Sequence, residues 1–226
     1  MGDMMRLMMS DGAEISAYHA SAQGARRGGL VLVQEIFGLT EHIRELCDEY
    51  AADGYEVIAP SLYDREHPDF QADYTGPDFE RAMELAKKLH PFDLSIADAG
   101  TCIDWMAQRG GPLFITGYCY GGSVAWAMAA RSDKLAAASS YYGSMVPTML
   151  ADAAPKCPTI CHFGRFDAGI PMAGVDGLIE RQHPLAQIFV YDANHGFNSD
   201  RRKDYHEESS ELARNRTLAL FRACGG

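Results

Sequence analysis

Short apolar runs alternate with longer amphipathic stretches along the whole of this 226-residue chain. The run at 29–34, GLVLVQ, has the continuous apolar character of a strand that is buried on both faces. The longer stretches repeat their apolar residues at helical spacing. Strands that alternate with helices predict an α/β fold, in which helices cover both faces of a mostly parallel central sheet.

The expected elements begin with a hairpin and end with a helix. We expect strands at 4–9, 13–20, 29–34, 55–59, 113–116, 136–141, 159–163 and 187–191, and helices at 40–52, 79–89, 93–108, 122–131, 175–181 and 205–222. Thr40 is a candidate N-cap of the first helix, and Gly54 is a candidate stop signal for it. The polar segment 63–76 shows no clear period, which is typical of lids and binding loops.

Length and composition indicate one domain that spans residues 1–226. The chain is 47% hydrophobic, enough for a sizeable core, and no linker interrupts it. Its formal net charge of −11 argues against nucleic-acid and anionic-membrane partners. The first residues lack the features of a signal peptide, so we expect a cytoplasmic protein. We also expect a monomer or weak homodimer that acts on a small molecule.

The six cysteines are more consistent with free thiols than with disulfides, because the chain is long, core-rich and without secretory features. Cys47 and Cys102 share helical spacing with apolar neighbours and are predicted in the core. Cys157 and Cys161, beside His162, raise the alternative of a metal site. An extended run would spread these side chains apart, so the core interpretation is favoured. We expect no metal and no cofactor.

One cysteine has different neighbours. The segment Gly117-Tyr118-Cys119-Tyr120-Gly121-Gly122 follows an apolar strand and opens an alanine-rich helix, as in the nucleophile elbow G-x-S-x-G with cysteine in the serine place. The sulfur would lie near a helix N-terminus, which favours thiolate. The Tyr120 N–H would be one oxyanion donor. The alternative is a buried structural cysteine beside a glycine-rich turn.

A nucleophile of this type needs a histidine and a carboxylate later in the chain. Three histidines follow Cys119 before the last helix. His162 lies inside an apolar strand, and His183 ends a polar helix and is predicted at the surface. His195 follows the last strand, where α/β sites gather their residues. His195 is therefore the predicted base.

The carboxylate has two candidates. Asp167 follows the strand that ends near residue 163, again at a strand end. Asp192 is only three residues from His195 and is less suited to reach the far ring nitrogen. We therefore predict Asp167 as the acid that orients the imidazole of His195. The order nucleophile, acid, histidine is that of α/β-hydrolases.

With these motifs the chain resembles the dienelactone hydrolase family, whose members are carboxymethylenebutenolidase-like enzymes of the α/β-hydrolase fold. The resemblance spans nearly the whole chain. The matching segments are QEIFG at 34–38, GYCYGG at 117–122, SYYG at 140–143, HFGRFD at 162–167 and ANHGF at 193–197.

The resemblance implies further roles. Glu35 would contact the resting thiol and take part in forming the thiolate when substrate binds. The Ile36 N–H would be the second oxyanion donor. Family members that act on the dienelactone carboxylate use two arginines, but Phe79 and Ser199 occupy the matching positions here. Arg81 and Arg201 lie nearby and could serve with a shift of register; the alternative is a different substrate. Tyr118 and Tyr142 could line an aromatic pocket, and the alternative for Tyr142 is a packing role beside Tyr141.

The favoured function is hydrolysis of an enol-lactone or activated carboxylic ester through a cysteine acyl-enzyme. Three alternatives stay open: a general carboxylesterase or thioesterase, a non-catalytic module that binds a small ligand, and a redox-sensing thiol protein. The last lacks a Cys-x-x-Cys partner.

Overall fold

The computed structural model describes all 226 residues. Contacts divide them between two units, residues Met1–Phe114 (unit 1) and Ile115–Gly226 (unit 2). The single domain expected from composition therefore stays a prediction.

Unit 1 is built on the strands β1 (Asp3–Met8), β2 (Glu14–Ala20), β3 (Gly28–Val33) and β4 (Tyr55–Pro60), in the spatial order β1-β2-β4-β3. The pairs β1–β2 and β2–β4 are antiparallel, and β3–β4 is parallel. Every residue of β3 and β4 is buried, which explains their continuous apolar sequences. The predicted N-terminal hairpin is confirmed.

Two long helices pack on these strands: α1 (Glu41–Ala52) against β2 and β4, and α3 (Phe92–Ala107) against β3 and β4. Thr40 caps α1 as predicted, since its hydroxyl accepts a hydrogen bond from the Ile43 N–H at 3.4 Å. Asp53 closes the helix, and Gly54 follows in the left-handed region at φ 96°.

The predicted helix at 79–89 differs from the structure. The helix α2 (Gly76–Glu84) begins three residues earlier because Pro77 fits its first turn. It then widens into a π-helical turn, η1 (Leu85–Leu89), which closes with a bond from the His90 N–H to the Leu85 carbonyl at 2.9 Å.

The irregular segment before α2 is anchored rather than loose. Arg65 forms two hydrogen bonds to the fully buried carboxylate of Asp98 in α3, at 2.7 and 2.8 Å, and also pairs with Asp11. Asp64 accepts bonds from the Ser61 hydroxyl and the Ser16 N–H. A bidentate contact to a buried carboxylate holds this segment in one place.

Unit 2 begins within β5 (Leu113–Tyr118). It also contains β6 (Ala137–Tyr141), β7 (Thr159–Gly164) and β8 (Ala186–Tyr191), and the spatial order is β5-β6-β7-β8. The pairs β6–β7 and β7–β8 are parallel. The strands β5, β6 and β7 are buried throughout, while β8 is partly exposed, as expected at an edge.

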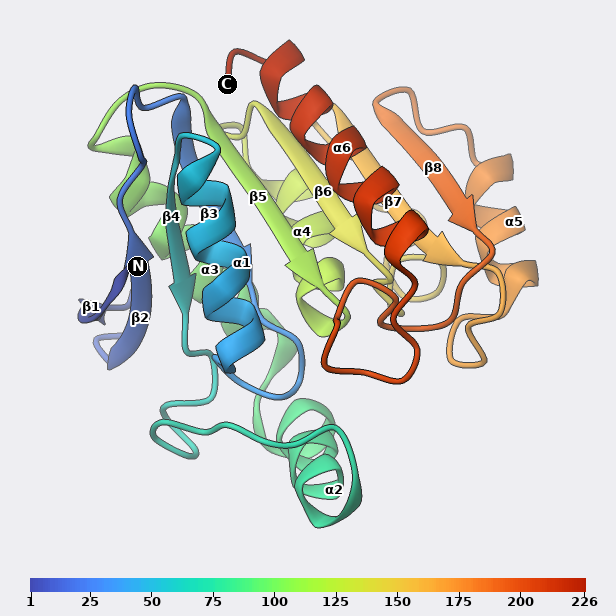
Figure 1. The fold of residues 1–226 in the computed structure, drawn as a ribbon, viewed down its shortest axis with the longest axis horizontal. Helices are drawn as coiled ribbons and strands as arrows, with labels where there is room; N and C mark the ends of the chain where they lie inside the picture. The colour runs from blue at the N-terminus through green and yellow to red at the C-terminus, as the bar shows by residue number, and fades with distance from the viewer. The chain divides into compact units, whose positions relative to one another are not determined.

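Three helices complete unit 2: α4 (Tyr120–Arg131), α5 (Met172–Glu180) and α6 (Glu207–Ala223). Figure 1 shows α6 in front of β6 and β7, with α4 behind the strands, so helices cover both faces here. The alanine-rich α4 is buried nearly all round. The buried positions 209, 213, 217 and 221 of α6 recur every four residues, on one face.

A buried polar cluster joins α6 to the strands. The Thr217 hydroxyl lies within hydrogen-bond distance of Ser139, Tyr141 and His162, at 2.8, 2.8 and 3.2 Å. The other ring nitrogen of His162 meets the Tyr191 hydroxyl at 2.8 Å. His162 is thus a satisfied sheet residue, as its position inside an apolar strand predicted.

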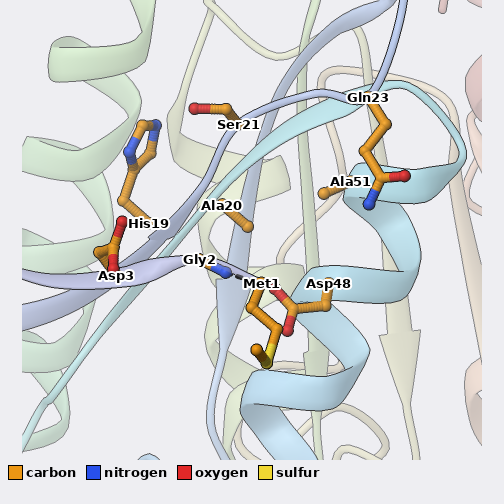
Figure 2. A pocket seen from close by; sticks show the side chains of 9 residues that line it. All are labelled: Met1, Gly2, Asp3, His19, Ala20, Ser21, Gln23, Asp48 and Ala51. Atoms are coloured by element: carbon orange, nitrogen blue, oxygen red, sulfur yellow. Dashed lines mark hydrogen bonds between the residues drawn. The ribbon is translucent and has the colours of Figure 1, made fainter.

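A cavity of about 210 Å³ opens in unit 1, beside the start of β1 (Figure 2). Its polar lining includes Asp3, His19 and Asp48, and Asp48 accepts a hydrogen bond from the Gly2 N–H at 2.8 Å. None of the predicted catalytic residues lines it. No helix has the length and apolar character that a membrane span needs.

Candidate active site

Cys119 lies on the turn between β5 and α4. Its backbone is strained, with φ 55° and ψ −113°, a region that residues other than glycine rarely occupy. Its N–H donates to the Tyr141 carbonyl at 3.0 Å, and its own carbonyl accepts from Gly122 and Ser123 in the first turn of α4. The turn therefore has the strand–turn–helix form of a nucleophile elbow.

Glycines make this turn possible. A Cβ on Gly117 would lie 2.1 Å from the Gly121 carbonyl oxygen, and one on Gly122 would lie 2.4 Å from the Tyr141 carbonyl oxygen. These contacts are too short for any side chain. The glycines at both positions are required by the close approach of helix and strand.

His195 meets the thiol and the predicted acid at the same time. Its Nε2 lies 3.2 Å from the Cys119 sulfur, and its Nδ1 lies 2.6 Å from the Asp167 Oδ2. The second carboxylate oxygen of Asp167 accepts from the Gly169 N–H at 2.8 Å. Three residues that are far apart in sequence thus form one continuous row of contacts at the ends of β5, β7 and β8.

The loops that carry the acid and the base are joined by their backbones. The Arg165 N–H donates to the Tyr191 carbonyl at 2.7 Å, and the Phe166 N–H donates to the Ala193 carbonyl at 3.0 Å. Gly164 allows this approach, since a Cβ there would lie 2.4 Å from the Ala193 oxygen. The separation of Asp167 and His195 is therefore set by backbone contacts.

The surroundings of His195 favour its charged form. Burial lowers the pKa of His195, but the negative charge of Cys119 and the hydrogen bonds to Asp167 and Cys119 outweigh it and raise the pKa to about 10. A charged imidazole 3.2 Å from a cysteine sulfur can stabilise the thiolate form, which is the nucleophilic form of cysteine.

The rival residues lie elsewhere. Asp192 pairs with Arg165 at 2.7 Å, and its side chain is 74% exposed. His162 is fully buried, and burial lowers its pKa to about 3, so it stays neutral. His183 is half-buried rather than exposed as predicted, because its ring packs on Trp126 and meets the Ala151 carbonyl at 2.8 Å.

Glu35 and Ile36 belong to unit 1, where they follow β3. Both are buried, and Glu35 is only 1% exposed. The neighbouring Gln34 accepts a hydrogen bond from the Leu62 N–H at 3.3 Å. A buried carboxylate at the end of a buried strand is uncommon and is consistent with a functional role. The predicted roles of Glu35 and Ile36 toward the thiol stay predictions.

The remaining predicted site residues fall into two groups. Tyr118 and Tyr142 are buried aromatic residues of unit 2, and Tyr120 is the first residue of α4, so its N–H belongs to the helix N-terminus. Arg81 in α2 pairs with Glu84, and Arg201 lies 3.6 Å from Asp200; both arginines are partly exposed. Oxyanion binding by Tyr120 and substrate binding by the others stay predictions.

The hydrogen bond from the Gly169 N–H to Asp167 was not predicted from the sequence. This N–H orients the Asp167 carboxylate from the side opposite His195. The signal was present, because Asp-x-Gly is typical of turns in which an aspartate binds the backbone two residues on.

All six cysteines are free thiols, and Cys47, Cys102, Cys157 and Cys161 are buried as predicted. No group of three or more His, Cys, Asp or Glu side chains is placed to hold a metal ion.

Comparison with known proteins assigns this arrangement to a family. The sequence profile of the dienelactone hydrolase family matches residues 15–225. The chain belongs to the dienelactone hydrolase family.

Relatives match over most of their length. A Salmonella typhimurium protein named "Putative carboxymethylenebutenolidase" is 36% identical over 237 residues, which cover 96% of this chain and 86% of that protein. An Escherichia coli K12 protein of the same name is 35% identical, with 96% and 85% covered. The crystal structure of a Klebsiella pneumoniae protein named "Putative Dienelactone Hydrolase" superposes with a TM-score of 0.83 at 33% identity and covers 98% of this chain and 99% of that one.

These matches confirm the predicted α/β-hydrolase fold, and family membership makes the chain a hydrolase. The family resemblance drawn from the five sequence segments is confirmed as well.

Proposed function

We propose that this hydrolase cleaves an enol-lactone or an activated carboxylic ester through an acyl-enzyme on Cys119, with His195 as base and Asp167 as the acid that orients it. The observation that carries the proposal is the row of contacts from Cys119 through His195 to Asp167, at 3.2 and 2.6 Å. The nucleophile, base and orienting carboxylate of a triad are recognised by such distances.

The first half-reaction forms the acyl-enzyme. The Cys119 thiolate attacks the carbonyl carbon, a C–S bond forms, and the carbonyl electron pair moves onto the oxygen. The N–H groups of Ile36 and Tyr120 would stabilise this oxyanion. As the tetrahedral intermediate collapses, the C–O bond to the leaving enolate breaks, and the His195 imidazolium can supply a proton to it.

The second half-reaction releases the product. Neutral His195 removes a proton from water as the water oxygen attacks the thioester carbonyl. The C–S bond then breaks, and Cys119 leaves as thiolate. Asp167 stabilises the imidazolium at this stage through its bond to Nδ1. The net reaction consumes one ester bond and one water and yields an acid and an enol or alcohol.

The substrate class follows from the leaving group and from the relatives. A thiolate leaves a tetrahedral intermediate more readily than an alkoxide or an amine does. The substrate must therefore carry a good leaving group, and enol or aryl esters suit this nucleophile better than amides. The relatives named as carboxymethylenebutenolidases support an enol-lactone. We further propose that Glu35 controls thiolate formation and that Arg81, Arg201, Tyr118 and Tyr142 contact the substrate.

A substrate panel tests this function. Wild type and C119A are assayed with a dienelactone, a saturated lactone, a p-nitrophenyl ester and an acyl thioester, with C224S as the control because Cys224 is a half-exposed thiol outside the triad. We expect turnover of the enol-lactone or aryl ester, its loss in C119A and its retention in C224S. Undiminished turnover by C119A would contradict the proposal. A preference for the acyl thioester would instead indicate that the protein is a thioesterase.

A further inference from the structure

Tyr142 has a backbone conformation that a tyrosine rarely adopts. Its φ is 38°, and it is one of four non-glycine residues with positive φ; the others are Asp69, Cys119 and Gln182. Positive φ in a bulky residue is strained and persists where surrounding contacts impose it. Two of the four, Cys119 and Tyr142, lie within the candidate site.

Backbone contacts hold Tyr142 on both sides. Its N–H donates to the His162 carbonyl at 2.8 Å, which continues the pairing of β6 with β7. The preceding carbonyl, of Tyr141, accepts the Cys119 N–H at 3.0 Å. A Cβ on the following residue, Gly143, would lie 2.7 Å from the Ser123 nitrogen. The backbone around Tyr142 is therefore fixed to the turn that carries the thiol.

From this backbone the Tyr142 side chain packs against His195, the residue that contacts the Cys119 sulfur. The ring of Tyr142 lies 5.0 Å from the ring of His195, at an angle of 59°. Its other side meets Phe197 at 5.3 Å in an edge-to-face contact. Tyr142 is fully buried, so the ring cannot turn away into solvent.

We propose that Tyr142 is a positioning residue that sets the distance between the Cys119 sulfur and the His195 imidazole. Its backbone is joined to the nucleophile turn through Tyr141, and its ring packs against the base. This inference rests on the proposed roles of Cys119 and His195. It gives Tyr142 a role besides the substrate contact proposed above, because contact with the base needs no substrate.

The ring, rather than the hydroxyl, performs this role. Without the ring, His195 gains freedom to rotate about its side-chain bonds, and the bond to Asp167 remains to orient the imidazole toward the sulfur. A misplacement of about 1 Å at a reacting group can cost about 100-fold in rate. This loss falls on the chemical step and on thiolate formation, apart from any effect on KM of the substrate contact proposed above.

The test reads the thiol directly. In a C224S background, the rate of Cys119 alkylation by iodoacetamide is measured from pH 5 to pH 10 for Y142F, Y142G and Y142N. Glycine and asparagine tolerate the positive φ, so these two variants remove the ring without adding backbone strain. Q182G is the matched control, because Gln182 has φ 49° on the exposed surface of the same unit.

We expect Q182G to keep the wild-type alkylation profile and Y142F, which keeps the ring, to lie closer to it than Y142G and Y142N do. Y142G and Y142N should alkylate about 10-fold more slowly at neutral pH, with the profile shifted toward that of an ordinary thiol. In ester assays the same variants should lose kcat, in addition to any rise in KM from the lost substrate contact. A wild-type alkylation profile in Y142G and Y142N would overturn the proposal, as would a loss confined to KM.

The variant F197L provides a second test in case Y142G and Y142N do not fold. It keeps Tyr142 and removes one wall behind its ring, so we expect a smaller shift of the profile in the same direction. No shift in folded F197L together with unfolded Tyr142 variants would assign Tyr142 to folding and overturn the proposal. Failure of the proposed function is distinguishable, because it would appear as undiminished turnover by C119A.

Discussion

Asp167 touches His195 through one carboxylate oxygen and the Gly169 N–H through the other. Replacement of Asp167 by asparagine keeps the shape but puts an amide where a carboxylate held the imidazole. A lost triad aspartate lowers kcat by about 10⁴-fold in a well-studied protease. We expect D167N to lose at least about 100-fold in kcat on an activated ester, measured by steady-state kinetics.

The matched control for that change is D192N. Asp192 is the other carboxylate near His195 in sequence, but its side chain is 74% exposed and pairs with Arg165. Exposed ion pairs contribute little, about 0–1 kcal/mol. D192N should retain kcat. A larger loss in D192N than in D167N would instead assign Asp192 as the carboxylate that orients His195.

The titration of His195 depends on its neighbours. The pKa of His195 is raised from 6.5 to about 10, and the charge of Cys119 is the largest contribution that raises it. C119A should therefore lower the pKa of His195, as measured by NMR of the ring. An unchanged pKa in C119A would contradict the thiolate–imidazolium pair.

The sign of the stability effect follows from the same shift. Because the folded pKa of His195 lies above the unfolded value, its contribution to stability is complete below about pH 6.5 and is lost as the pH rises toward 10. The alkaline decline in the free energy of unfolding should be smaller in C119A than in wild type.

The contact between α4 and β6 depends on the absence of a side chain at position 122. A Cβ on Gly122 would lie 2.4 Å from the Tyr141 carbonyl oxygen, so G122A must push the helix from the strand. We expect a loss of about 1–3 kcal/mol in urea unfolding, typical of overpacking. The thiol should also alkylate more slowly, since Cys119 begins this helix.

G174A is the control within the same unit. Gly174 lies in α5, and a Cβ there would lie no closer than 3.5 Å to any neighbour. We expect G174A to be neutral or to stabilise by about 0.4–1 kcal/mol. Equal destabilisation by both changes would show that helix packing at Gly122 is not special.

The sequence predicted most elements because the signals for them are local. The apolar runs located the strands, and Thr40 located the start of α1. The π-helical turn at Leu85–Leu89 was missed, since its periodicity over five residues cannot be told from that of an α-helix.

The site was predicted in part for the same reason. The proximity of Cys119, Asp167 and His195 could be expected because each follows a strand, and the strand ends of a parallel sheet converge. The role of Tyr142 could not, because its backbone conformation depends on His162 and Cys119, which are distant in sequence.

The buried histidine His162 makes the stability of the whole protein sensitive to acid. Burial and the nearby Arg216 charge lower the pKa of His162 to about 3. The unfolded chain takes up a proton below about pH 6.5 and the folded chain does not, so stability is complete above that pH and falls as the pH is lowered toward 3.

Equilibrium urea unfolding at pH 7 and pH 5 checks this prediction. Wild type should lose more stability than H162Q over that interval, because glutamine does not titrate. An equal loss in both proteins would place the acid sensitivity in other titratable groups.

Intact-protein mass spectrometry can show whether Cys119 carries the acyl group during turnover. Wild type is mixed with a slowly released p-nitrophenyl ester, quenched in acid within the first turnover and weighed, then digested to locate the adduct. We predict one added acyl group on the peptide that contains Cys119, and none in C119A. An adduct on another residue, or p-nitrophenol release by C119A at the wild-type rate, would contradict this prediction.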